Sequence, residues 1–201
     1  MTRLCAHGDA GQAFPIYITV VGGLLLLAFA YLAVGQAAAN RNSAQTAADA
    51  AALAAALDTR DALTDEWVQN VLDPTKWQDI FNGGGVPFDG CARADQLAAQ
   101  NDATVQCAPH PEWSPPGYKV VSRTNQSVGD SIVPGTENQH STESATAVIE
   151  PRCEFELPGT GADPAVLPKL MCEDGVDWTL DPQHLTDLPK PEDLFDVHLA
   201  D

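Results

Sequence analysis

Residues 16–34 read IYITVVGGLLLLAFAYLAV, and no Asp, Glu, Lys or Arg occurs from Ala13 to Ala39. A helix needs about 20 such residues to cross a hydrocarbon core of roughly 30 Å. A buried core helix is normally shorter or amphipathic. A cleaved secretory signal is the stronger alternative, because residues 37–39 form an A-x-A-like site, although the apolar region of a signal usually covers only about 7 to 15 residues. We therefore expect a transmembrane helix over residues 13–39.

The helical pattern continues beyond this apolar run. Residues 35–57 read GQAAANRNSAQTAADAAALAAAL, and alanine, the best helix former, is the most frequent residue in them. Proline is absent from Ile16 to Val71. We expect one helix over residues 14–57, about 66 Å long at about 1.5 Å per residue. Its outer part, residues 40–60, is predicted to be an Ala-rich stalk that stands clear of the lipid.

The alanines of this stalk recur at helical spacing along one side. Small side chains allow helix backbones to approach closely, so this face packs either on the chain's own folded part or on another subunit. The sequence leaves both alternatives open. Asp49 is the one charged residue of the predicted interface, where it would pair with a basic group of a partner. The predicted interface consists of Ala44, Ala48, Asp49, Ala51 and Ala55.

Acidic side chains outnumber basic ones by 28 to 10, which gives a net charge of −18. This charge rules out a basic DNA-binding protein and argues against nucleic acid, or an anionic lipid surface, as the main partner. Positive charge marks the cytoplasmic side of a membrane helix, and the short N-terminal side carries Arg3 and the α-amino group. We expect residues 1–12 to be a short cytoplasmic leader and the bulk of the chain to be exported.

Four of the five cysteines lie on the predicted exported side, where disulfides persist. Four cysteines allow three pairings. Loop size favours the nearest-neighbour pairs, Cys91 with Cys107 and Cys153 with Cys172. Each bond is expected to stabilise the fold by roughly 3 kcal/mol.

Residues 61–152 are predicted to form an exported α+β domain, with a small antiparallel sheet on which short helices pack. Leu63, Trp67 and Val71 fall on one side of a short helix that ends before Pro74. Another helix is expected over 91–101. β-branched residues between Pro/Gly turns predict strands over residues 104–107, 118–124, 127–133 and 142–150.

Residues 153–201 carry 12 acidic and 2 basic side chains among several prolines. This acidic, Pro-rich C-terminal section is predicted to be a largely solvated extension. Asp-Pro pairs at its helix starts predict short helices over 164–171 and 182–188. The piece from Lys190 onward is expected to be mobile.

No motif for catalysis or for a cofactor occurs in the sequence. The five histidines lack the spacing of an H-E-x-x-H zinc site, and the glycines at 83–85 are not followed by the Lys-Ser or Lys-Thr of a phosphate-binding loop. No G-x-S-x-G marks a nucleophile. We therefore expect neither an enzyme nor a cofactor or metal site.

The N-terminal segment resembles a known family. Gly11-Gln12-Ala13, the long apolar run, and QTAADAAALAAA at residues 45–56 are similar to the TadE/TadG-like proteins of tight-adherence (Flp) pilus assembly. The resemblance covers roughly residues 8–57. It implies a pseudopilin-like minor component of the cytoplasmic membrane that acts in assembling an adhesive filament. Prepilin-type processing would cut after Gly11, so that Gln12 leads the mature chain, but Ile16 then stands where the family has a glutamate.

The leading hypothesis is a structural protein, anchored by a single membrane pass with its N-terminus in the cytoplasm, that acts by helix packing. Its predicted partners are the lipid bilayer and other pilin or pilus-assembly subunits. The alternative is an anchored or secreted acidic extracytoplasmic binding module unrelated to pili. A mature N-terminus at Gln12 supports prepilin-like processing, one at Asn40 indicates a secreted domain, and an intact one indicates a permanent anchor.

Overall fold

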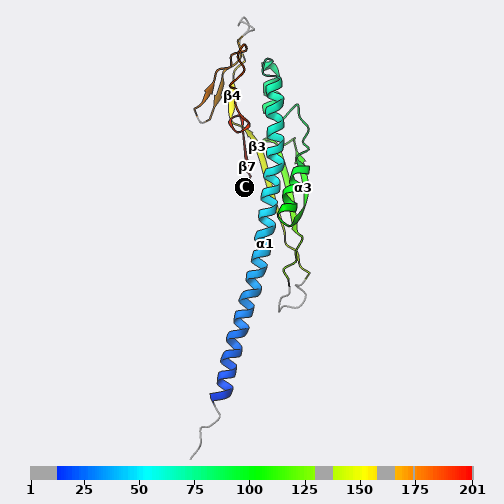
Figure 1. The fold of residues 1–201 in the computed structure, drawn as a ribbon, viewed down its shortest axis with the longest axis vertical. Helices are drawn as coiled ribbons and strands as arrows, with labels where there is room; N and C mark the ends of the chain where they lie inside the picture. Colours follow the sequence, from blue (N-terminus) through cyan, green and yellow to red (C-terminus); the bar gives the residue numbers. More distant parts are fainter. Residues whose placement is uncertain (1–12, 130–137, 158–165, 174, 201) are drawn as a thin grey trace, which may run out of the picture.

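The structure is a computed structural model that describes residues 13–129, 138–157, 166–173 and 175–200. Its longest element is helix α1, Ala13–Gln69, with 57 residues. At about 1.5 Å per residue, α1 is about 86 Å long, and Figure 1 shows its N-terminal part extending far beyond the rest of the chain. The long N-terminal helix predicted from the sequence is confirmed.

Helix α1 does not stop near residue 57. Leu63 and Trp67, which the sequence analysis assigned to a separate short helix, lie in the last turns of α1 and are buried. That boundary was wrong because no glycine or proline occurs between Gly35 and Pro74, so nothing in the backbone interrupts the helix.

The chain as a whole is an α+β fold, as predicted. After α1 come η1 (Pro74–Lys76), α2 (Trp77–Phe81) and α3 (Cys91–Gln100). A four-stranded antiparallel sheet has the order β1-β2-β3-β7, with β1 at Ala103–His110, β2 at Gly117–Thr124, β3 at Thr142–Pro151 and β7 at Phe195–Leu199. A second sheet contains β4 (Cys153–Phe155), β5 (Leu170–Cys172) and β6 (Asp177–Trp178), and α4 (Pro191–Leu194) precedes β7.

One face of the four-stranded sheet is covered by the C-terminal half of α1, with α3 beside it. Helix α1 contacts β2, β3 and α3, while α3 also contacts β1. In β2, Tyr118, Val120, Ser122 and Thr124 alternate with more exposed residues and are buried. This alternation is that of a strand with one covered face, so α1 and the sheet bury each other over the alanine-rich part of the helix.

An aromatic cluster ties the end of α1 to the C-terminal section. The ring centroids of Trp67 and Trp77 are 5.5 Å apart, and those of Trp77 and Phe155 are 5.3 Å apart. Phe81 lies 5.4 Å from Phe195, centroid to centroid. Because aromatic side chains bury large apolar areas, the section after residue 153 shares one core with the rest of the domain.

The predictions for this section were largely wrong. Residues 170–172 form strand β5 instead of the end of a helix over 164–171, and residues 182–188 form turns instead of a helix. The chain from Lys190 onward is not a mobile end, because it forms α4 and then β7, which pairs with β3. Non-local strand pairing overrides the local Asp-Pro signals. Of the strand predicted over 127–133, residues 127–129 are not in a strand, and the remainder lies outside the described residues.

Candidate functional site: the two halves of the long helix

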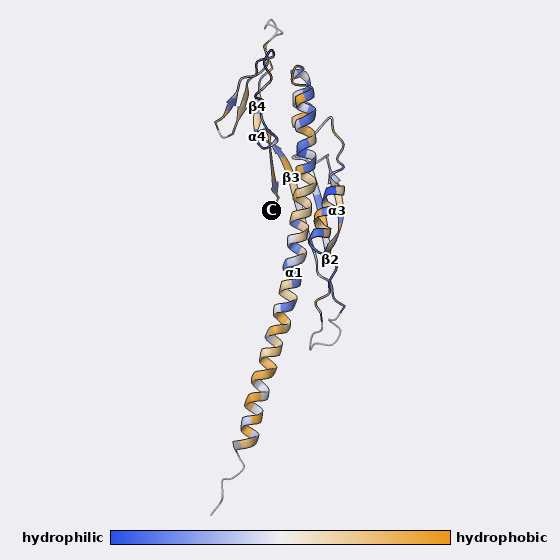
Figure 2. Ribbon diagram, viewed as in Figure 1, coloured by the Kyte–Doolittle hydropathy of each residue, from blue (hydrophilic) through white to orange (hydrophobic). Residues whose placement is uncertain are grey.

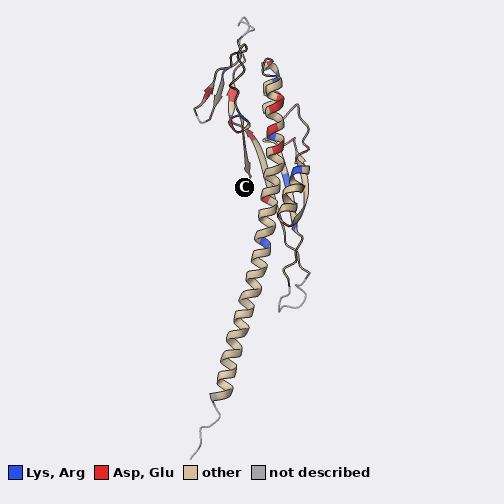
Figure 3. Cartoon of the chain, in the orientation of Figure 1, with Lys and Arg blue, Asp and Glu red and all other residues tan. Residues whose placement is uncertain are grey.

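The N-terminal half of α1, residues 14–39, is not covered by any other described part of the chain and has no charged side chain. The exposed fractions are 66% for Leu26, 81% for Tyr31 and 70% for Val34. Figure 2 shows this half as almost continuously hydrophobic, and Figure 3 shows no charged residue on it. Among the described residues, α1 is the one helix long and apolar enough to cross a membrane. An apolar surface of this extent needs a partner other than water, and the exposed apolar half of α1 therefore suggests membrane anchoring.

The C-terminal half of α1 is covered by the chain's own domain. Ala44, Ala48, Ala51 and Ala55 of the predicted stalk interface each have 0% of their surface exposed. They lie under the sheet and α3. Of the two alternatives, packing on the chain's own folded part or on another subunit, the structure shows the first. Because these side chains end at Cβ, the neighbouring backbones come close, and an ideal Cβ built on Gly90 would lie 2.3 Å from the carbonyl oxygen of Ala55. The alanine face is thus filled by the protein itself.

Asp49, the charged member of the predicted interface, is partly buried at the edge of this contact. Its carboxylate accepts a hydrogen bond of 2.7 Å from Nε2 of Gln45, one turn earlier on α1. Its described partner is therefore a residue of the same helix. Gly11 and Gln12, the predicted processing site, lie outside the described residues.

The boundary between the two halves is formed by Asn40. Its Nδ2 donates to the carbonyl oxygen of Gln126 at 3.1 Å, and its Oδ1 accepts from the backbone N–H of Ser141 at 3.1 Å and from Oγ1 of Thr124 at 3.2 Å. The next residue, Arg41, forms an ion pair of 2.5 Å with Glu143 on β3. These contacts fix the end of the β2–β3 hairpin to α1 directly after its exposed half, residues 14–39.

Two buried hydroxyls hold the helix and the sheet together above this boundary. Ser122 donates through Oγ to the carbonyl oxygen of Ala44 at 2.6 Å. Tyr118 shares a hydrogen bond of 2.6 Å with Thr59 of α1 and accepts one of 3.1 Å from the N–H of Gly90. Burial raises the pKa of the Tyr118 hydroxyl, partly offset by these hydrogen bonds, so the phenol stays protonated and neutral in the core.

Cys91, Cys107, Cys153 and Cys172 form two disulfides. Cys91 at the start of α3 is bonded to Cys107 on β1, and Cys153 on β4 is bonded to Cys172, its direct cross-strand neighbour on β5. These are the nearest-neighbour pairs. The first bond ties α3 to the edge of the main sheet, and the second closes the smaller sheet.

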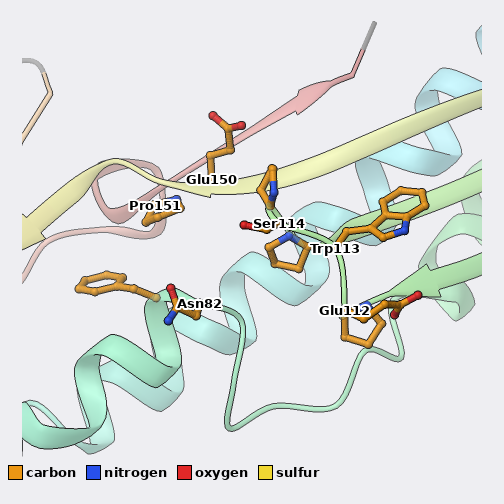
Figure 4. A pocket seen from close by; sticks show the side chains of 10 residues that line it. Asn82, Glu112, Trp113, Ser114, Glu150 and Pro151 are labelled. Carbon is orange, nitrogen blue, oxygen red and sulfur yellow. The ribbon is translucent and has the colours of Figure 1, made fainter.

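A surface groove of about 610 Å³ lies between α2 and the β1–β2 connection (Figure 4). The carboxyl groups of Glu112 and Glu150 on its rim point in different directions in this view. Oε1 of Glu112 lies 3.1 Å from Nδ1 of His110. The hydrogen bond from this imidazole lowers the pKa of the Glu112 carboxyl. His110 in turn stacks on Trp113, with the ring centroids 3.9 Å apart. The described residues contain no group of three or more His, Cys, Asp or Glu side chains able to hold a metal ion.

Of the comparisons with known proteins, the one with protein families matches the long helix. No curated protein and no solved structure matches the chain. The family described as "Putative Flp pilus-assembly TadE/G-like" matches residues 11–58, which include the exposed half of α1 and most of the covered alanine face. This match spans about a quarter of the 201 residues. The family resemblance seen in the sequence is therefore confirmed for the N-terminal segment, residues 11–58, which matches the putative TadE/G-like Flp pilus-assembly family.

Proposed function

We propose that the protein is a single-pass membrane component of Flp pilus assembly, of the minor-pilin or pseudopilin type. Residues 1–12 lie in the cytoplasm in this proposal, and everything from Asn40 onward lies outside. The observation that carries it is the exposed, uncharged half of α1 within the segment that matches the family. The two disulfides support the orientation, because such bonds persist in exported proteins.

The proposed contact with other pilus subunits is helix packing inside the membrane. The alanines of the covered half are already occupied by the domain, so they are not open to a partner while the domain is docked. The exposed half offers small residues at several positions, including Gly22, Gly23 and Ala30. Small residues allow close packing of helices in lipid, where no hydrophobic force favours association. A neighbouring subunit is therefore expected to contact residues 14–39.

This proposal predicts where crosslinks to other subunits form. A photoreactive amino acid at Leu25, in the exposed half, is expected to yield covalent adducts with other pilus-assembly proteins in membranes of cells that assemble the system. The same amino acid at Val68, which is partly exposed on the domain end of α1, is the matched control. Mass spectrometry of the adducts identifies the partners. Adducts that arise at Val68 but not at Leu25 would contradict packing through the exposed half.

A further inference from the structure

The sheet of the exported domain starts where the apolar run of α1 ends. Residues 14–33 are 20 in number and suffice to cross a hydrocarbon core of roughly 30 Å. The next six residues, 34–39, rise about 9 Å, close to the roughly 5 to 8 Å that the headgroup layer adds on one side of a bilayer. Asn40, which holds the β2–β3 hairpin, is then at the outer edge of the headgroups. No free stalk remains between the bilayer and the domain.

The part of the hairpin at this level has an unusual composition for this chain. Its described residues, 125–129 and 138–141, are Asn, Gln, Ser, Val, Gly and Asn, Gln, His, Ser, and they include no Asp, Glu, Lys or Arg. In a chain with a net charge of −18, these nine described residues are neutral apart from His140, whereas the connecting residues 130–137, outside the described part, contain Asp130 and Glu137. Amide and hydroxyl groups hydrogen-bond phosphate and ester oxygens. Acidic side chains would instead be repelled by anionic lipids.

Two arginines flank this neutral stretch. Arg41 on α1 has 74% of its side chain exposed although it pairs with Glu143. Arg123, at the end of β2, is also exposed. Arg41 follows the exposed half of α1 by two residues, and Figure 3 shows most acidic residues of α1 toward its other, C-terminal end. Asp102 and Glu143 are the described acidic residues near the arginines by strand register, so the charges of the described residues balance at this end.

We infer that this end of the domain rests on the membrane and contacts phospholipid headgroups. The contact surface consists of residues 125–129 and 138–141 together with Arg41 and Arg123, and we call it the membrane-side surface. The arginines bind lipid phosphates, and the amides bind phosphate and ester oxygens. The inference rests on the proposed membrane anchor and adds that the domain is seated on the bilayer in a fixed position.

Fluorescence quenching in nanodiscs tests the membrane-side surface with the full chain. Cys5→Ser removes the one cysteine outside the disulfides. A fluorophore is then attached at Gln126→Cys or, as a matched control, at Lys119→Cys. Lys119 is exposed on β2 and lies about 13 Å farther from the membrane-side end than Arg123 along the strand. With nitroxide-headgroup lipid present, we expect several-fold stronger quenching at 126 than at 119.

A third label at Leu26→Cys, with nitroxide on the acyl chains, separates the inference from the proposed function. Strong quenching at 26 combined with equally weak quenching at 126 and 119 overturns the membrane-side surface and leaves the anchor intact. No quenching at 26 overturns both. In discs with anionic lipid, Arg123→Glu should reduce quenching at 126, whereas Lys119→Glu, with the same change of charge, should not. Equal effects of the two substitutions would also count against the arginine contact.

Discussion

Gly90→Ala is expected to lower the stability of the folded domain strongly. A Cβ at this position would lie 2.3 Å from the carbonyl oxygen and 3.0 Å from Cα of Ala55. Both atoms belong to the backbone of α1, so no change of rotamer relieves the overlap, and α3 must move away from the helix. The same movement strains the hydrogen bond from the Gly90 N–H to Tyr118. Overpacking of this kind costs about 3 kcal/mol or more.

Thermal denaturation of the full chain in detergent measures this effect. For a protein of this size, a loss of about 3 kcal/mol lowers Tm by about 6 to 12 °C. Gly35→Ala is the matched control. Gly35 lies in α1, the helix that Gly90 contacts, and a Cβ at Gly35 meets nothing within 4 Å. If both variants melted at the temperature of the parent protein, the close approach of α3 and α1 would be refuted.

Leu26→Arg is expected to disrupt membrane integration of the chain. Leu26 lies in the middle of the uncharged run and is 66% exposed. Replacing leucine by arginine at the centre of a membrane helix costs about 3 to 4 kcal/mol on insertion scales. The fraction of protein that resists alkaline extraction from membranes should therefore fall several-fold. Because the disulfides form only outside the cytoplasm, the fraction of oxidised Cys91–Cys107 should fall with it.

The control for this second variant is Val68→Arg. Val68 is on the same helix and partly exposed, but it lies at the domain end beyond the apolar run. Its substitution should leave both extraction resistance and disulfide formation nearly unchanged. A Leu26→Arg protein that is retained in membranes and oxidised like the parent would show that the exposed half is not the anchor.

The sequence sufficed to predict the long helix because its determinants are local. Alanine content, the absence of proline and glycine after Gly35, and an unbroken apolar run each act within a few residues. The end of the helix was placed too early only because the composition changes after Leu57, although the backbone has no reason to stop there. Three of the four predicted strands were likewise marked by local alternation between turn residues.

The C-terminal section could not be predicted in the same way. Strand β7 pairs with β3 across more than 40 intervening residues, and β5 is placed by its pairing with β4. Such pairing depends on which edge is free in the folded sheet, which no local pattern encodes. A signal for β7 was present in the alternation of Phe195, Val197 and Leu199. The acidic composition and the prolines masked it.

From the sequence one could predict an alanine-rich face on the helix but not what covers it. The alanine face is buried. Alanine side chains allow another backbone to approach, but they do not determine which part of the protein covers them. Asn40, Gly90 and Tyr118, which fasten the domain to the helix, were not singled out. Asn40 carried no distinguishing local signal, because Gln36, with the same amide group, comes before it after the apolar run. The contacts of Gly90 and Tyr118 require the fold.

A single distance tests the continuous helix most directly. Spin labels at Tyr31→Cys and Asp61→Cys, in the Cys5→Ser background, sit on exposed positions of the bare and the domain-covered halves of α1. Pulsed electron paramagnetic resonance of the full chain in nanodiscs should give one narrow distribution near 45 Å, the rise of about 1.5 Å for each of the 30 residues between them. A broad distribution, or one centred well short of that distance, would show a hinge between membrane segment and domain and contradict a continuous helix.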